Sequence, residues 1–215
     1  MRSTRGFTLI ELMVAIAVMA LLALVSWRGL EGMARAQQQN RERGDAVLTL
    51  QAALSQWSAD LDATVALSQV SAMDWDGRVL RLTRRSTDSS TPQVYVVAWT
   101  LRTDSAGRTR WSRWQSPGFT THAEWQAAWD RATAWAQDGS NESRGAEVDL
   151  MPVDGWQLAY FRDNSWGPAV SAQALGTGNS LPDGVRLVLN LPPGLALAGL
   201  LTQDWVRPSL TVPKS

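Results

Sequence analysis

A single carboxylate, Glu11, interrupts an apolar run close to the start of this chain. The run extends from Phe7 to Val25. At about 1.5 Å per helical residue it is long enough to cross most of a bilayer core of about 30 Å. An acidic side chain at the centre of a bilayer costs about 2.5–3.5 kcal/mol on insertion scales. We therefore expect Glu11 to lie near an interface, to be protonated or to meet a cation.

Other polar side chains have the types needed for catalysis. His122 is the only histidine, so a serine triad is allowed by count, but no Gly-x-Ser-x-Gly turn accompanies it. Asp60 with Asp62, and Asp74 with Asp76, have the types of a glycosidase pair or of calcium ligands. We interpret the histidine as a solvated helix end and the aspartates beside Gly77, Asp74 and Asp76, as turn formers. The twelve-residue calcium-loop pattern is missing. We predict no catalytic residue, no metal and no cofactor.

The chain contains 12 tryptophans. Several of them could stack sugar rings, since aromatic faces with polar rims bind carbohydrate as well as protein. The members of this set are Trp99, Trp111, Trp114, Trp125, Trp129, Trp135 and Trp156. Core and interface packing is the interpretation we favour, because each ring buries about 150–250 Å² and a small β core needs several rings. A surplus ring on the surface is then a candidate contact for another protein.

Length and charge indicate one anchored domain. Of the 215 residues, about 30 form the leader and the apolar run, which leaves an ordinary domain of about 100–200 residues. The 20 basic and 20 acidic residues do not indicate a nucleic-acid partner. The absence of cysteine excludes a disulfide-stapled fold, a cysteine nucleophile and a thiolate metal site. Arg2 and Arg5 precede the apolar run and place the N-terminus on the cytoplasmic side.

A long helix is predicted to follow the apolar run. Apolar residues recur at spacings of three and four and draw one stripe: Val47, Leu50, Leu54, Trp57 and Leu61. The helix is expected to run unbroken from about Phe7 to about Val65, with the stripe packed on a globular domain. A coiled-coil seam is the alternative, but it needs three or four sustained heptads.

The remaining sequence predicts strands, turns and one short helix. Strands are expected at residues 78–83, 94–101, 109–114, 156–161, 185–191 and 199–206. The segment from about Val94 to Trp114 reads as an antiparallel hairpin. Thr121 and Glu124 have capping-box spacing and predict a helix near residues 122–137. Polar loops are expected at 86–92, 138–143 and 175–180. The predicted fold class is α+β, a long N-terminal helix packed on antiparallel β-sheet.

The segment from Gly6 to Leu12 resembles the type III signal of type IV pilins and type II secretion pseudopilins. The resemblance implies that a prepilin peptidase cleaves between Gly6 and Phe7 and methylates the new amino terminus of Phe7. It implies that Arg2 and Arg5 supply the leader charge. It also implies that Glu11 is the assembly residue, whose carboxylate neutralises the terminal amine of a neighbouring subunit in an apolar filament core.

Two simpler interpretations of the N-terminus are weaker. A cleaved secretory signal needs a small-residue cleavage site, whereas residues 25–29 carry bulky side chains. An ordinary signal anchor explains the apolar run and the arginines but gives no reason for Glu11.

The strands carry a second resemblance. Residues 75–84, the pair Trp111 and Trp114, and residues 161–166 and 181–187 are similar to the minor pseudopilin J family of the general secretory pathway, although residues 121–143 look like an insertion. This resemblance implies a pilin-like, non-enzymatic subunit of the type II secretion system. Its implied partners are minor pseudopilins I and K in the pseudopilus tip complex, with pseudopilin H linking that tip to the major pseudopilin G.

The resemblance also implies an organisation along the chain. We predict a leader at residues 1–6, a transmembrane helix at 7–27, a periplasmic continuation of the helix at 28–66 and a β-rich periplasmic head at 67–215. The inner membrane is the expected location, and exported cargo is a further candidate partner. A minor type IV pilin for adhesion or DNA uptake is the alternative in the same structural class. A membrane-tethered periplasmic hydrolase or carbohydrate-binding protein is the alternative from a different class.

Overall fold

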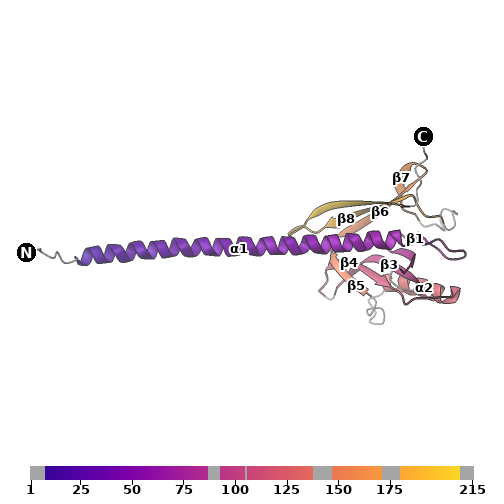
Figure 1. Ribbon diagram of the computed structural model, residues 1–215, viewed down its shortest axis with the longest axis horizontal. Coiled ribbons are helices and arrows are strands. Elements are labelled where there is room, and N and C mark those ends of the chain that lie inside the picture. Colours follow the sequence, from indigo (N-terminus) through magenta and orange to yellow (C-terminus); the bar gives the residue numbers. More distant parts are fainter. Residues whose placement is uncertain (1–7, 87–92, 105, 138–146, 171–179, 209–215) are drawn as a thin grey trace, which may run out of the picture. The chain divides into compact units, whose positions relative to one another are not determined.

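The computed structural model describes residues 8–86, 93–104, 106–137, 147–170 and 180–208. The chain divides into two compact units, Met1–Asp45 and Ala46–Ser215. Helix α1 (Leu9–Asp62) begins in the first unit and ends in the second (Figure 1). Of the predicted polar loops, residues 87–92, 138–143 and 175–179 lie outside the described residues.

The predicted long helix is confirmed as α1. It ends after Asp62, where Thr64 leaves the helical path to form an isolated β-bridge with Arg84. The Thr64 hydroxyl donates to the carbonyl of Asp60 at 2.9 Å and so satisfies one of the last helical acceptors. In the second unit the apolar stripe faces inward, with Trp57 and Leu61 fully covered.

The first sheet has five antiparallel strands in the order β1-β2-β3-β4-β5. They are β1 (Met73–Trp75), β2 (Leu80–Arg85), β3 (Val94–Thr103), β4 (Thr109–Gln115) and β5 (Glu147–Pro152). The predicted hairpin is confirmed as β3 and β4. Its turn is closed by Asp104, whose carboxylate accepts from the N–H groups of Ala106 and Arg108, both at 2.9 Å. Gly107 adopts the positive φ of 76° that this turn requires.

The second sheet has four antiparallel strands in the order β7-β6-β8-β9. They are β6 (Gly155–Arg162), β7 (Ser165–Pro168), β8 (Gly184–Leu191) and β9 (Gly199–Val206). Alternate residues of β8 are buried, as expected for a strand with one solvated face. The strands predicted at 156–161, 185–191 and 199–206 correspond to β6, β8 and β9.

Two apolar clusters form the core of the second unit. The larger joins Trp57 and Leu61 of α1 to residues of both sheets, among them Leu82 and Leu187. The smaller lies on the other face of the first sheet, under helix α2 (His122–Gln137). Figure 1 shows α2 beside β3, in agreement with their packing contacts. Each face of the first sheet is therefore covered by a helix.

The structure corrects the predicted strands in two ways. The first long strand begins at Leu80 instead of residue 78, because the N–H groups of Arg78 and Val79 both donate to the Asp76 carboxylate and complete a turn. Strands β1, β5 and β7 were not predicted. β1 has 3 residues and β7 has 4, which is too short for a visible alternation. β5 is an edge strand with two acidic residues and little burial, so its sequence lacks the usual apolar pattern.

The arrangement confirms the predicted fold class. A long N-terminal helix is followed by antiparallel sheet and a short helix, which is an α+β, pilin-like fold. The short helix was predicted near residues 122–137, and α2 occupies those residues.

Candidate functional site

Glu11 lies in the first turn of α1, where it closes a capping box with Thr8. The N–H and the hydroxyl of Thr8 both donate to Glu11 Oε2 at 2.9 Å. The N–H of Glu11 in turn donates to the Thr8 hydroxyl at 3.4 Å. This reciprocal pattern satisfies donors that every helix start leaves open. Glu11 therefore has a local partner within its own chain.

Sequence reasoning missed Thr8, although the signal for it was present. Thr8 and Glu11 have the Thr-x-x-Glu spacing that predicted the start of α2 at Thr121 and Glu124. Both residues lie at the start of the apolar run, where a glutamate is first interpreted as a charge in lipid. Its role as a helix cap was therefore not predicted. The other predicted residues of this region, Gly6, Phe7, Arg2 and Arg5, lie outside the described residues.

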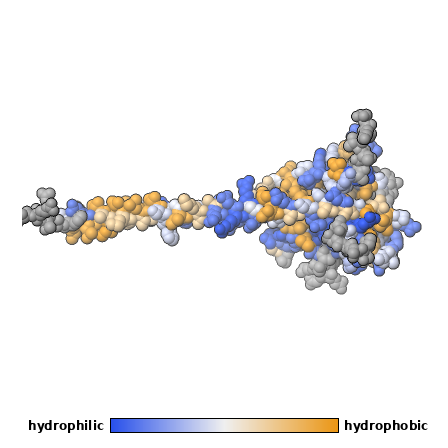
Figure 2. All heavy atoms as spheres, viewed as in Figure 1, coloured by the Kyte–Doolittle hydropathy of each residue, from blue (hydrophilic) through white to orange (hydrophobic). Residues whose placement is uncertain are grey.

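The first unit presents its apolar residues outward. Every residue from Thr8 to Asp45 is exposed in the protein alone. Among the described residues, α1 is the one helix long and apolar enough to cross a membrane. Figure 2 shows the apolar stretch near the start of α1 giving way to a hydrophilic stretch. Exposed apolar surface of this extent requires lipid or protein around it.

The hydrophilic stretch of α1 is stabilised by pairs one turn apart. Arg35 donates to Glu31 at 2.8 Å, and Gln38 donates to Glu42 at 2.8 Å. Such pairs support a helix that has little packing of its own by about 0.2–0.5 kcal/mol each. This part of α1 is thus built to stay helical in water.

The N-terminus agrees with a known sequence motif. Residues 1–27 match the model of the prokaryotic N-terminal methylation motif. The matched segment contains Arg2 and Arg5, Gly6, Phe7 and Glu11 and the apolar run. No curated protein matches the chain. The methylation motif therefore characterises the chain as type IV pilin-like or pseudopilin-like at its N-terminus, and the second unit has to be judged on its own contacts.

His122, which we interpreted as a solvated helix-end histidine, lies at the start of α2. The side chain is exposed on the first residue of α2, its Nε2 lies 3.1 Å from the carbonyl oxygen of Gln69, and its ring packs against Trp125. Glu124 caps the same helix end, because its carboxylate accepts from the N–H groups of Thr120 and Thr121 at 2.9 and 3.0 Å. These hydrogen bonds lower the pKa of Glu124 below its usual value.

Asp60 and Asp62 have separate partners, whereas Asp74 and Asp76 both pair with Arg81. Asp62 accepts a hydrogen bond from the Trp205 indole at 2.7 Å, whereas Asp60 points into the core. Asp76 forms the expected turn, but the interpretation of Asp74 as a turn former is wrong, because this residue lies in β1 and binds Arg81. Within the described part of the chain, no group of three or more histidines, aspartates and glutamates is placed to hold a metal.

The tryptophans suspected of sugar stacking belong to the core. Of the set named above, all but Trp156 are buried, and Trp156 is half-buried. Trp57 packs against Trp99 and Trp111 at ring-centroid distances of 5.3 and 5.5 Å. The preference for core packing over a carbohydrate platform is therefore confirmed for these residues. Trp166, at 37% exposure, is an exposed ring of the second sheet.

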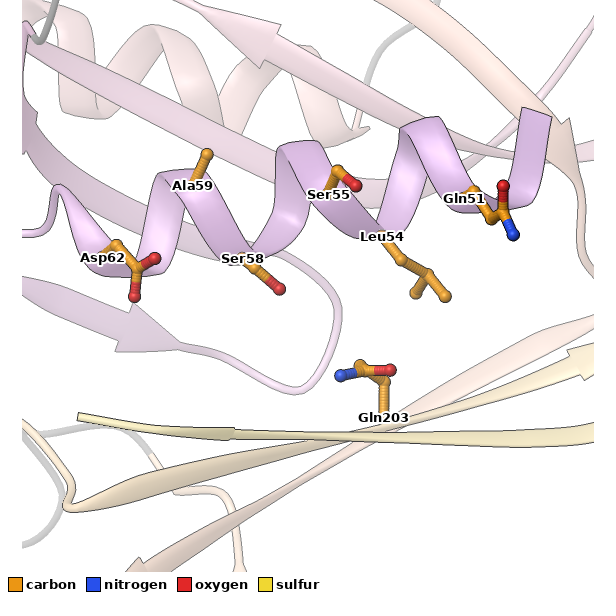
Figure 3. A pocket seen from close by; sticks show the side chains of 7 residues that line it. All are labelled: Gln51, Leu54, Ser55, Ser58, Ala59, Asp62 and Gln203. Atoms are coloured by element: carbon orange, nitrogen blue, oxygen red, sulfur yellow. The ribbon is translucent and has the colours of Figure 1, made fainter. Parts of the chain in front are cut away.

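An open groove runs between α1 and β9. It has a volume of about 610 Å³ and is lined by Gln51, Leu54, Ser55, Ser58, Ala59, Asp62 and Gln203. Figure 3 shows Leu54 and Ser58 directed from the helix toward the strand that carries Gln203. The lining is mostly small and polar, with two serine hydroxyls and the carboxylate of Asp62, which accepts a hydrogen bond from the Trp205 indole.

Asp60 holds the end of α1 on the first sheet. Its side chain is fully buried and accepts hydrogen bonds from Arg113 Nε at 2.7 Å and Arg113 Nη2 at 2.9 Å. The Trp99 indole donates to the same carboxylate at 2.9 Å, and Arg84 binds it as well. A buried carboxylate stabilises the packing only while donors such as these remain in place.

Proposed function

We propose that this protein is a minor pseudopilin of the type II secretion system. It is made as an inner-membrane precursor, cleaved after Gly6, methylated on Phe7 and incorporated into the tip complex of a periplasmic pseudopilus. The tip complex starts assembly of the filament that helps to export folded proteins across the outer membrane. In this proposal the protein is not an enzyme and needs no cofactor.

The observation that carries the proposal is a methylation motif joined to a pilin-like fold. The motif occupies residues 1–27, and the same helix α1 that starts within it ends packed on antiparallel sheet. Glu11 has a cap partner in the isolated chain, but that partner is neutral and leaves the carboxylate without a cation among the described residues. A processed amine from a neighbouring subunit supplies the missing positive charge in lipid.

Two features of the sequence support assignment to the secretion system. The strand segments that resemble pseudopilin J are residues 75–84, 161–166 and 181–187, and these contribute to β1, β2, β6, β7 and β8. The chain lacks the cysteines that close the C-terminal loop of many major pilins. Pseudopilins I, K, H and G are accordingly the proposed partners, together with prepilin peptidase.

A minor type IV pilin is the second candidate, because the methylation motif serves both classes of filament. The genes beside this one distinguish the two, since secretion components are expected for a pseudopilin and pilus components for a pilin. Purification of the protein with candidate minor pseudopilins provides the direct test. We expect a stable complex with I and K.

The first experiment tests processing. Mass spectrometry of the protein extracted from membranes is expected to show a chain that begins at methylated Phe7. An intact Met1, or a cut near Ser26, contradicts the proposal.

The second experiment separates assembly from catalysis. Glu11→Ala is expected to abolish secretion, while His122→Ala leaves it intact, because the first removes the charge needed for assembly and the second removes an exposed side chain at a helix end. Loss of secretion with His122→Ala alone supports a tethered enzyme instead.

A further inference from the structure

Strand β9 is the least protected sheet edge in the described part of the second unit. It ends its sheet and runs for 8 residues, Gly199–Val206, in unbroken register with β8. Its sequence contains no proline and no lysine. A strand that ends a sheet is usually short, charged, bulged or interrupted by proline, because its unpaired N–H and C=O groups attract another strand.

The other three edges of the two sheets carry such protection. β1 has 3 residues and β7 has 4. β5 contains two acidic residues, and its register with β4 shifts once. In β9 the one charged residue, Asp204, is paired with Arg186 at 2.7 Å, and the apolar side chains of Leu200 and Val206 are 77% and 63% exposed. The sequence of β9 therefore does not oppose pairing with a further strand.

The hydrogen bonds between β8 and β9 determine which backbone groups face outward. The N–H of Arg207 donates to the carbonyl of Asp183 at 2.9 Å, directly after the last paired residues of the two strands. Because bonded and non-bonded positions alternate in an antiparallel pair, Gln203, at the same phase of this alternation, is bonded to β8 as well. The N–H and C=O groups of Thr202 and Asp204, on either side of it, therefore point toward the free edge.

The groove described above lies along this free edge. Its lining comes from α1 and β9 alone, so it opens on the side of β9 away from β8. Figure 3 shows Gln203 directed from the strand toward the helix, on the same face as Trp205, whose indole binds Asp62 of α1. Since side chains of a strand alternate between the two faces, every second side chain of a strand added beside β9 enters the groove. Its volume of about 610 Å³ and its serine and alanine lining accommodate them.

Charge favours a basic side chain at one end of the groove. The carboxylate of Asp62 lines the groove and accepts a hydrogen bond from the Trp205 indole at 2.7 Å, which brings no counter-charge. α1 ends at Asp62 without a basic residue in its last turn, and the end of a helix adds about half a negative charge. A lysine or arginine that reaches this end from an added strand is attracted by both.

We propose that β9 accepts an extended segment of a neighbouring protein chain as an added strand, with a lysine or arginine of that segment against Asp62. Main-chain hydrogen bonds to Thr202 and Asp204 provide the affinity, and the groove selects the alternate side chains. That the neighbour is another pseudopilin rests on the proposed function; the strand-addition site itself does not.

The test uses the full chain in neutral detergent micelles. The probe is a synthetic peptide with blocked ends, Thr-Val-Thr-Lys-Thr-Val-Thr, followed by NMR titration and amide hydrogen exchange. We expect saturable binding that slows exchange of the Thr202 and Asp204 amides and leaves the Gln203 amide, already bonded to β8, unchanged. The same peptide methylated on every backbone nitrogen cannot donate hydrogen bonds to β9, and its apparent affinity is expected to be at least about tenfold lower.

Variants of the chain test the same contacts from the other side. Thr202→Pro removes one outward N–H, and proline is tolerated where the N–H of an edge strand faces solvent. Its affinity for the peptide is expected to fall at least about tenfold, whereas Thr202→Val keeps the N–H and is expected to bind like the wild type. Asp62→Asn is expected to weaken binding of the lysine peptide and to leave unchanged the binding of a peptide with glutamine in place of lysine. The methylated peptide keeps the test decisive if Thr202→Pro does not fold.

Several results overturn the proposal. Equal binding of the methylated and unmodified peptides shows docking without strand addition, and the absence of saturable binding shows that β9 does not accept a strand. Binding that appears only after deletion of residues 209–215 shows that the chain fills this edge itself. Peptide binding to the purified chain does not depend on cleavage after Gly6 or on secretion, so failure here is distinct from failure of the proposed function.

Discussion

The indole N–H of Trp99 on β3 donates to the carboxylate of Asp60 on α1 at 2.9 Å. This bond connects the centre of the first sheet to the last turn of the helix that carries the methylation motif at its other end. The surrounding core is apolar, and a polar contact inside it fixes the angular position of the helix more narrowly than apolar packing does. The position of the end of α1 on the first sheet therefore depends on a small number of buried polar contacts.

Replacement of Asp60 by asparagine is expected to lower the free energy of unfolding by about 3–5 kcal/mol, because two guanidinium groups lose their buried counter-charge. Denaturant unfolding of the full chain in detergent, followed by tryptophan fluorescence, measures the loss. Asp62→Asn is the matched control on the same helix turn, since Asp62 is exposed and has one indole partner. Equal losses in the two variants contradict the assigned role of Asp60.

Truncation of Trp57 tests the larger apolar cluster. This ring is fully buried between α1 and the sheets, so Trp57→Ala leaves a cavity and is expected to cost about 3–5 kcal/mol of unfolding free energy. Trp166→Ala serves as the comparison, because Trp166 is 37% exposed and packs mainly on Phe161 and Arg186. The same denaturation experiment measures both. A smaller loss for Trp57 than for Trp166 means that the core is assigned incorrectly.

The cap of α2 predicts a pH dependence. Hydrogen bonds from the N–H groups of Thr120 and Thr121 lower the pKa of Glu124 below the ordinary value of 4.5. The contribution of Glu124 to stability is therefore fully present above that ordinary value and is lost as the pH falls through the lowered one. Thermal midpoints of the wild type and Glu124→Ala should differ near neutral pH and converge in acid. Asp130→Asn is a control in the same helix, and an unchanged difference at low pH contradicts the cap.

Glu11→Gln separates the two roles of this side chain. Glutamine also serves in a capping box, so the bonds with Thr8 can form, but the negative charge is lost. We expect the variant to be inserted and cleaved after Gly6 and to be absent from sheared pseudopilus fractions examined by immunoblot. Thr8→Val keeps the charge and weakens the cap, and it should be incorporated. Normal incorporation of Glu11→Gln shows that the cap, and not the charge, is what assembly needs.

Local patterns allowed much of the fold to be predicted. The period of the apolar stripe located the buried side of α1, and the Thr-x-x-Glu pattern located the start of α2 at His122. Strands β6, β8 and β9 have alternating or β-branched sequences that stand out from their turns. In each case the signal lies within a few neighbouring residues, where backbone geometry alone determines which side chains share a face.

The sequence by itself determined the N-terminal segment, in which basic residues and a glycine precede an apolar run with one acid, Glu11. The free-energy cost of that acid in lipid follows from its residue type and needs no coordinates. The tertiary structure decided the environment of Asp60. Arg84 and Arg113 are 24 and 53 residues away in the chain, and only the pairing of β2, β3 and β4 under α1 brings them to one carboxylate. Burial and charge balance are properties of such distant contacts, so no local pattern could distinguish Asp60 from the exposed Asp62 beside it.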